Sequence, residues 1–183
     1  MDKNKDKWTE VERKVLNFLF AHPTTSFHGR ELARQIKVSP TSITNAVKRL
    51  ANKNLVTSTK DILLSVKLNR ENPKSFESKR WANLSNLYES GLVDLISKKA
   101  PGSAIIVFGS YSLGEDTEES DIDIALIGGS KPFNLEPELF KFESNQLLKR
   151  KINVEYINKF KDLKATLQES IINGIVLKGA LQL

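Results

Sequence analysis

Two aspartates, Asp121 and Asp123, stand two residues apart at the start of an apolar run that covers residues 121–127. In a β-strand, residues i and i+2 lie on the same face, so both carboxylates should point one way while Ile122 and Ile124 point into a core. Neighbouring carboxylates repel each other unless a cation lies between them. Oxygen ligands favour Mg²⁺ or Mn²⁺. The spacing therefore predicts a site for a hard divalent cation.

Two further features belong with this pair. Gly109 and Ser110 directly follow a short apolar strand expected at residues 104–108. Backbone amides that open a helix attract phosphate oxygens, and glycine lets the backbone come close to them, so this turn is a candidate phosphate site. Glu155 is a lone carboxylate in a third expected strand, residues 152–157, and a carboxylate in such a strand needs a partner. We expect Glu155 to join the aspartates as a third acid and to complete a two-metal site.

The rest of the second half should frame this site. We expect a helix over residues 137–151 and an amphipathic helix over residues 162–179. The loop 115–119 lacks the residue order of a calcium-binding loop. Its four carboxylates are expected to be solvated and without a role in the chemistry: Glu115, Asp116, Glu118 and Glu119.

A longer motif runs through this region: Gly109-Ser110-Tyr111, then Gly114, then Ser120-Asp121-Ile122-Asp123. It resembles the signature of the minimal nucleotidyltransferases of the DNA polymerase beta-like superfamily, over about residues 84–160. The chain departs from the family pattern at Leu113, where many members carry arginine, and at Glu155, where aspartate is usual. Lys131, Lys149 and Lys151 are candidates to supply positive charge instead.

The resemblance implies a small mixed sheet flanked by helices, and transfer of a nucleoside monophosphate from a nucleoside triphosphate, expected to be ATP, to a hydroxyl of a protein, nucleic acid or small molecule. It also implies a helical, toxin-like partner protein or a homodimer that completes the site. By the same resemblance the nucleotide would be bound by Gly109, Ser110 and Ser120, and the catalytic, Mg²⁺-binding acids would be Asp121, Asp123 and Glu155.

The first half has a different pattern. Apolar residues recur at helical spacing over residues 8–20 and 29–36, and a third helix should begin at Ser39-Pro40, a good N-cap followed by a good first residue. Two strands around a turn at Lys60-Asp61 follow. This order resembles a winged helix-turn-helix, over about residues 8–70.

The third helix has a polar side that suits the major groove of double-stranded DNA, with long cations for phosphates. A dimerisation or protein-docking role for this fold is the alternative. The candidate DNA-binding residues are Ser39, Thr41, Ser42, Thr44, Asn45, Lys48 and Arg49.

The net charge differs between the two halves of the chain, as expected for two domains with different partners. The 183 residues have a net charge of +6, but residues 1–80 carry +9 and residues 81–183 carry −3. The basic half is the nucleic-acid candidate. The chain has no cysteine, and no apolar run approaches the ~20 residues that cross a bilayer. With no apolar signal region at the N-terminus, we expect a cytoplasmic protein without a membrane partner.

The fold class expected is α+β, with an N-terminal winged helix-turn-helix domain at residues 1–74 and a C-terminal nucleotidyltransferase-type α/β domain at residues 75–183. A connector helix over residues 73–100 should lead the second domain, with Trp81 and Tyr88 in its core or at an interface. The alternative function is a nucleotide-sensing or antitoxin-like transcription regulator whose second domain binds a nucleotide without turning it over.

Overall fold

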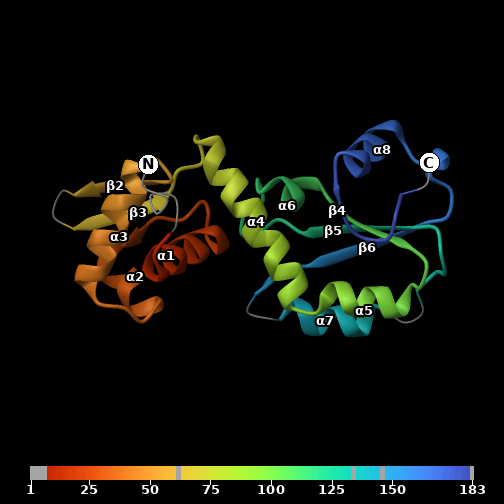
Figure 1. The fold of residues 1–183 in the computed structure, drawn as a ribbon, viewed down its shortest axis with the longest axis horizontal. Helices are drawn as coiled ribbons and strands as arrows, with labels where there is room; N and C mark the ends of the chain where they lie inside the picture. Colours follow the sequence, from red (N-terminus) through yellow and green to blue (C-terminus); the bar gives the residue numbers. More distant parts are fainter. Residues whose placement is uncertain (1–7, 61–62, 133–134, 145–146, 182–183) are drawn as a thin grey trace, which may run out of the picture. The chain divides into compact units, whose positions relative to one another are not determined.

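The computed structural model describes residues 8–60, 63–132, 135–144 and 147–181 (Figure 1). The chain forms two compact units, residues 1–79 and 80–183. The division lies inside the connector helix, a few residues after the boundary that we predicted at residue 74. The elements are α1 (Glu10–Ala21), β1 (Phe27–His28), α2 (Gly29–Gln35), α3 (Pro40–Asn52), β2 (Val56–Lys60), β3 (Leu64–Leu68), α4 (Pro73–Glu89), α5 (Leu92–Lys99), β4 (Ala104–Phe108), α6 (Gly109–Leu113), β5 (Ile122–Ile127), α7 (Glu136–Glu143), β6 (Ile152–Ile157), the 3₁₀ turn η1 (Phe160–Asp162), α8 (Ala165–Ile172) and β7 (Ile175–Lys178).

The first unit is a winged helix. Thr9 and Glu12 form a capping box at the start of α1, and Ser39 caps α3 by accepting a hydrogen bond from the Ser42 amide at 3.1 Å. Strands β2 and β3 pair antiparallel, and β1 adds a third strand to β3. The expected order of three helices and a hairpin is confirmed. The turn at Lys60-Asp61 lies partly outside the described residues.

The second unit is built on a four-stranded mixed sheet in the order β6-β5-β4-β7. Strand β5 pairs parallel with β6 and antiparallel with β4, which pairs antiparallel with β7. The predicted α+β class with a small mixed sheet is confirmed. The single helix predicted over residues 162–179 is wrong, because Asn173-Gly174 ends α8 and the β-branched residues Ile175 and Val176 continue as β7.

Strand alternation divides this sheet into two covered faces. Ile122, Ile124 and Leu126 of β5 pack on one face with α5 and α7 residues, whereas Ala125 and Ile127 pack on the other with Ile171 of α8. Figure 1 shows α8 on one side of the sheet and α5 and α7 on the other. Since Asp123 has the parity of Ala125, its side chain belongs to the face that α8 covers.

The connector is two helices rather than one. Gly91 has φ of +82°, a left-handed conformation that suits glycine, and it separates α4 from α5. Trp81 is 74% exposed, so the core alternative is wrong for this residue, and its place at an interface stays a prediction. Tyr88 is half exposed and donates a hydrogen bond from its hydroxyl to the carbonyl of Leu177 at 2.8 Å. No helix within the described ranges is long and apolar enough to span a membrane.

Candidate functional site

The two aspartates lie at the end of the sheet where β5 and β6 both begin. Asp121 directly precedes β5, and Asp123, its second residue, stands opposite Phe108 of β4 and Asn153 of β6. The Asn153 Nδ2 atom donates to Asp121 Oδ2 and to Asp123 Oδ1, each at 3.0 Å. One amide group therefore bridges both carboxylates, and the predicted common orientation of the two side chains is observed.

Glu155 is placed elsewhere. It stands opposite Ala125, two residues further along β6 than Asn153, and its side chain is exposed. Within the parts of the chain that the structure describes, no three His, Asp or Glu residues gather closely enough to hold a metal ion. The position beside the aspartates that we assigned to a third acid is thus occupied by the neutral Asn153.

Gly109 closes the site on the β4 side. It begins α6 directly after β4 with φ of +69°, and a Cβ atom there would lie 3.1 Å from Asp123 Oδ2. A side chain at this position would be strained and would crowd the carboxylate. Ser110 follows it and is half-buried, and the Ser112 hydroxyl donates to the Gly109 carbonyl at 2.8 Å.

The acidic loop contains one carboxylate that is structural. Asp116 is 1% exposed, accepts a hydrogen bond from Asn83 Nδ2 at 2.7 Å and pairs with Arg150 at 3.9 Å. The expectation that it is solvated is therefore wrong. Burial, together with the Asp116 charge, raises the pKa of Tyr111, so the phenol stays neutral. Ser120 accepts a hydrogen bond from the Thr117 amide at 2.9 Å and holds the turn before Asp121.

Positive charge near the aspartate pair is limited. Of the three candidate lysines, Lys151 has its Nζ atom 3.9 Å from Asp121 Oδ2, and its side chain is 68% exposed. Exposed pairs at this distance are screened by water and contribute little. The contacts of the pair among the described residues are therefore one shared neutral donor, Asn153, and one exposed lysine.

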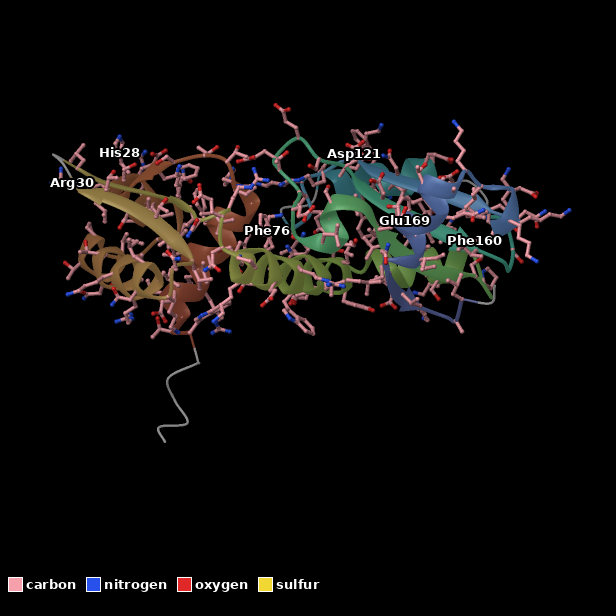
Figure 2. All side chains as sticks on the ribbon, turned by 90° about the horizontal axis from the view of Figure 1, so that it is seen from above. His28, Arg30, Phe76, Asp121, Phe160 and Glu169 are labelled. Carbon is pink, nitrogen blue, oxygen red and sulfur yellow. The ribbon has the colours of Figure 1, made fainter. Side chains whose placement is uncertain are left out.

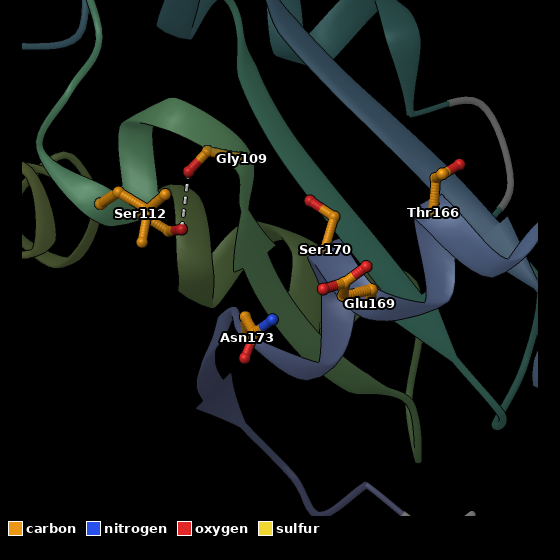
Figure 3. Close-up of a pocket in the computed structure, with 7 residues that line it drawn as sticks. Gly109, Ser112, Thr166, Glu169, Ser170 and Asn173 are labelled. Carbon is orange, nitrogen blue, oxygen red and sulfur yellow. Dashed lines mark hydrogen bonds between the residues drawn. The ribbon is translucent and has the colours of Figure 1, made fainter.

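Two hollows are each lined by a residue that lies against this pair, Gly109 in one and Asn153 in the other. A pocket of about 260 Å³ begins at Gly109 and lies between α6 and α8 (Figure 3). A larger hollow of about 610 Å³ follows the edge strand β6 and is lined by Asn153 and Glu155, with Lys131 and Lys151 among its other residues. Asp121 and Glu169, a residue of the smaller pocket, are labelled in Figure 2.

Helix α3, which carries the predicted DNA-binding residues, presents one polar stripe. Thr41, Thr44, Asn45 and Lys48, at positions i, i+3, i+4 and i+7 of α3, are all exposed. Within the helix, the Thr44 hydroxyl donates to the Pro40 carbonyl at 3.1 Å. At its start, the Ser39 and Ser42 hydroxyls bond to each other at 2.8 Å. The structure thus gathers the predicted residues, with Ser39 and Ser42 serving partly as a cap.

Arg49 differs from the rest of that set. Its Nε atom lies 2.7 Å from Oε1 of Glu12, whose side chain is only 3% exposed, so it joins α3 to α1. Burial raises the pKa of Glu12, but hydrogen bonds from Thr9 and Arg49 outweigh this effect and hold the pKa below its usual value. Arg49 therefore has a structural partner in addition to its predicted place in a DNA contact.

Comparison with known proteins agrees with the domain type predicted for each half of the chain. Residues 90–180 match the family described as polymerase beta, nucleotidyltransferase, and residues 8–61 match the MarR family. The chain joins a MarR-type winged helix to a polymerase beta-type nucleotidyltransferase domain. No curated protein sequence matches the chain significantly.

The solved structures similar to the chain include Lactococcus lactis ZitR, a MarR family member, and MepR, a transcription regulator. A double mutant of Lactococcus lactis ZitR is 23% identical over 52% of this chain and 73% of its own, with a TM-score of 0.35. MepR, a regulator of the Staphylococcus aureus multidrug efflux pump MepA, is 17% identical over 51% of this chain and 67% of its own, with a TM-score of 0.37. A ZitR mutant in complex with DNA is 21% identical over 54% and 74%, with a TM-score of 0.34.

Sequence reasoning missed two parts of the nucleotidyltransferase domain. Asn153 and Glu155 lie on the same face of β6, two residues apart. Sequence reasoning selects Glu155 because a carboxylate is a more typical ligand of a divalent cation than an amide. The second part is a polar stripe on α8, whose signal was the helical spacing of its members. These residues, at i, i+3, i+4 and i+7, are Thr166, Glu169, Ser170 and Asn173.

Proposed function

We propose that the nucleotidyltransferase domain transfers a nucleoside monophosphate from a nucleoside triphosphate, expected to be ATP, to a hydroxyl acceptor, and that the winged helix binds double-stranded DNA. The observation that carries the enzymatic proposal is the geometry of Asp121 and Asp123. Their carboxylate oxygens both lie 3.0 Å from one amide nitrogen, with no strong cation beside them among the described residues. Such a pair is costly unless it binds a cation.

The donor atoms fit Mg²⁺ or Mn²⁺. Mg²⁺ is usually held by one or two carboxylates together with substrate phosphates and water, and Asp121 and Asp123 supply that number. The three-acid, two-metal arrangement expected from the sequence is not needed for this binding. When bound, the ion would screen the triphosphate and polarise its α-phosphate.

The residues of the chain then have separate tasks. Gly109 and Ser110 would approach the phosphates through their backbone, while Asn153 orients the two carboxylates and Ser120 holds the turn before them. The acceptor oxygen attacks the α-phosphorus, a new P–O bond forms, and the bond to pyrophosphate breaks. Asn153 cannot take up the acceptor proton, so Asp121 or Asp123 would accept it or pass it to water.

The neutral Asn153 also favours a second candidate function. A site with two acids rather than three can bind a nucleotide without turning it over, and the domain would then be the nucleotide sensor of an antitoxin-like transcription regulator. The two candidates share the binding step and differ in the release of pyrophosphate.

The deciding experiment uses the full chain, α-labelled ATP, Mg²⁺ and acceptors of three classes: the protein itself, nucleic acid and small alcohols. We expect label transfer with pyrophosphate release, and at least about a hundredfold loss in the double variant Asp121→Asn plus Asp123→Asn. Circular dichroism of that variant controls for folding. Binding of Mg²⁺–ATP without pyrophosphate release would establish the sensor, and absence of binding would refute both candidates.

The DNA proposal is supported by the exposed stripe of α3 and the basic charge of the first half. Lys48 is an exposed cation on that stripe. Lys48→Ala should weaken duplex binding severalfold and reduce its salt dependence, because one phosphate contact is lost. Affinity that is insensitive to both salt and this substitution would favour a docking or dimerisation role for the winged helix.

A further inference from the structure

The pocket between α6 and α8 has neither aspartate among its lining residues, but Gly109 is one of them (Figure 3). Gly109 lies against Asp123, with its Cβ position 3.1 Å from Asp123 Oδ2. The pocket and the aspartates also share the face of the sheet that α8 covers. A ligand with one group at the aspartates can therefore extend across Gly109 into the pocket.

The wall formed by α8 is fixed in place. Ile171 is 1% exposed and belongs to the core beneath the helix. At the end of α8, a Cβ atom on Gly174 would lie 2.7 Å from the Val107 carbonyl, so the chain passes closely beside the last residues of β4. Gln168 Nε2 donates to the carbonyls of Phe160 and Leu163 at 3.2 and 2.9 Å and ties the preceding turn to the helix. These contacts hold the polar stripe of α8 beside Gly109.

The chemistry of the lining selects a class of ligand. Thr166, Ser170 and Asn173 offer neutral donors and acceptors, and Glu169 is the one charged residue among those that line this pocket. Within the described residues, the side chains of these four make no hydrogen bond or ion pair with the protein. A carboxylate repels phosphate but accepts hydrogen bonds from vicinal hydroxyls, as an acidic residue does toward ribose in dinucleotide sites. A sugar therefore suits the pocket better than a phosphate.

We infer that this pocket binds the ribose of the donor nucleotide, with Glu169 accepting hydrogen bonds from its hydroxyls. The inference rests on the proposed function and assigns the nucleoside part of that substrate to a place. A volume of about 260 Å³ is below the usual range for a whole drug-sized ligand and suits a sugar with part of a base. Leu113, 42% exposed at the same pocket, offers an apolar surface to the base.

The test measures binding by calorimetry in Mg²⁺, with the full chain and three ligands: ATP, 2′,3′-dideoxy-ATP and inorganic tripolyphosphate. Glu169→Gln should weaken ATP binding about tenfold, because hydrogen bonds to a charged acceptor are replaced by weaker ones. It should leave dideoxy-ATP within about twofold of wild type, and tripolyphosphate unchanged or slightly tighter. Glu119→Gln, which makes the same charge change at an exposed residue outside the pocket, is the matched control and should change none of the three.

The outcomes separate this inference from the proposal on which it rests. Unchanged ATP binding in Glu169→Gln, or equal weakening of ATP and tripolyphosphate, overturns the ribose site while the carboxylate site stands. Equal weakening of ATP and dideoxy-ATP also overturns it, because the hydroxyls would then have no part. If the wild-type chain binds neither ATP nor tripolyphosphate in Mg²⁺, the proposed function fails and this inference fails with it.

Discussion

Glu12 of the winged helix and the Asp121–Asp123 pair of the nucleotidyltransferase domain are carboxylates held by hydrogen bonds, but the charges of their partners differ. Glu12 is bound at 2.7 Å by the guanidinium of Arg49. The two aspartates are bridged at 3.0 Å by the neutral amide of Asn153. A buried acid that serves the fold is compensated within the fold, whereas a pair that keeps its negative charge is available to bind a cation from solution.

The largest effect on this comparison should come from removing the compensating charge of Glu12. We expect Arg49→Ala to lower the free energy of unfolding of the winged helix by about 1–2 kcal/mol, because a carboxylate that is nearly inaccessible loses a charged hydrogen bond. Urea unfolding followed by the fluorescence of Trp8, in a Trp81→Phe background, would report on this unit. Lys48→Ala, one residue away and exposed, is the matched control and should leave the unfolding free energy within about 0.5 kcal/mol.

The same ion pair gives a pH dependence of known sign. The pKa of Glu12 is lower in the folded chain than its ordinary value of 4.5. As the pH falls below the ordinary pKa of 4.5, Glu12 takes up a proton in the unfolded state before it does so in the folded state. The stability that the ion pair contributes is therefore lost as the pH falls from 4.5 through the lower folded pKa. This contribution is fully present above pH 4.5. The measurement is the free energy of unfolding as a function of pH. If it decreased as steeply at acid pH in Arg49→Ala as in wild type, this assignment would be contradicted.

A second substitution tests the other side of the comparison. Asn153→Asp adds a third carboxylate beside Asp121 and Asp123, so without metal the chain should melt at a lower temperature because like charges repel. Mg²⁺ should then bind on the order of tenfold more tightly than to wild type, because ligand charge tunes affinity. Thermal melting across a Mg²⁺ series measures both effects.

Asn153→Ala serves as the control, since it removes the bridging amide without adding charge. It should not gain Mg²⁺ affinity. Tighter Mg²⁺ binding in both variants would mean that Asn153 blocks the site rather than orienting the carboxylates, and an unchanged melting temperature of Asn153→Asp at every Mg²⁺ concentration would place the cation elsewhere.

Much of this architecture is encoded locally. The Ser39-Pro40 cap, the alternation of Asp121 and Asp123 with isoleucines, and the apolar strand before Gly109 each depend on near neighbours in the sequence, and each is observed. Asn153 could not be identified in this way, because its neighbours depend on the register between β5 and β6. A shift of that pairing by two residues would have placed Glu155 beside Asp123 instead.

Asp116 illustrates the same limit. In sequence it is one of several acids in a polar loop, and only the folded chain brings Asn83 and Arg150 to it. The break between α8 and β7 has a local signal in Asn173-Gly174. The prediction of one continuous helix followed from the helical spacing before this break, because the β-branched run after it is short. Long-range pairing decides which acids are compensated, and that distinction separates structural carboxylates from site carboxylates here.

The smallest expected effect concerns Lys151, the lysine nearest the pair. Its Nζ atom lies 3.9 Å from Asp121 Oδ2, but its side chain is 68% exposed and therefore well screened. Lys151→Ala should change Mg²⁺ affinity by less than about twofold and leave the unfolding free energy within about 0.5 kcal/mol. Calorimetric titration with Mg²⁺ gives the first quantity. If removing this lysine tightened Mg²⁺ binding by an order of magnitude, the ammonium would be a true counter-ion of the pair. The contrast between Glu12 and the aspartates would then be one of degree, with each acid neutralised by a cation from its own unit.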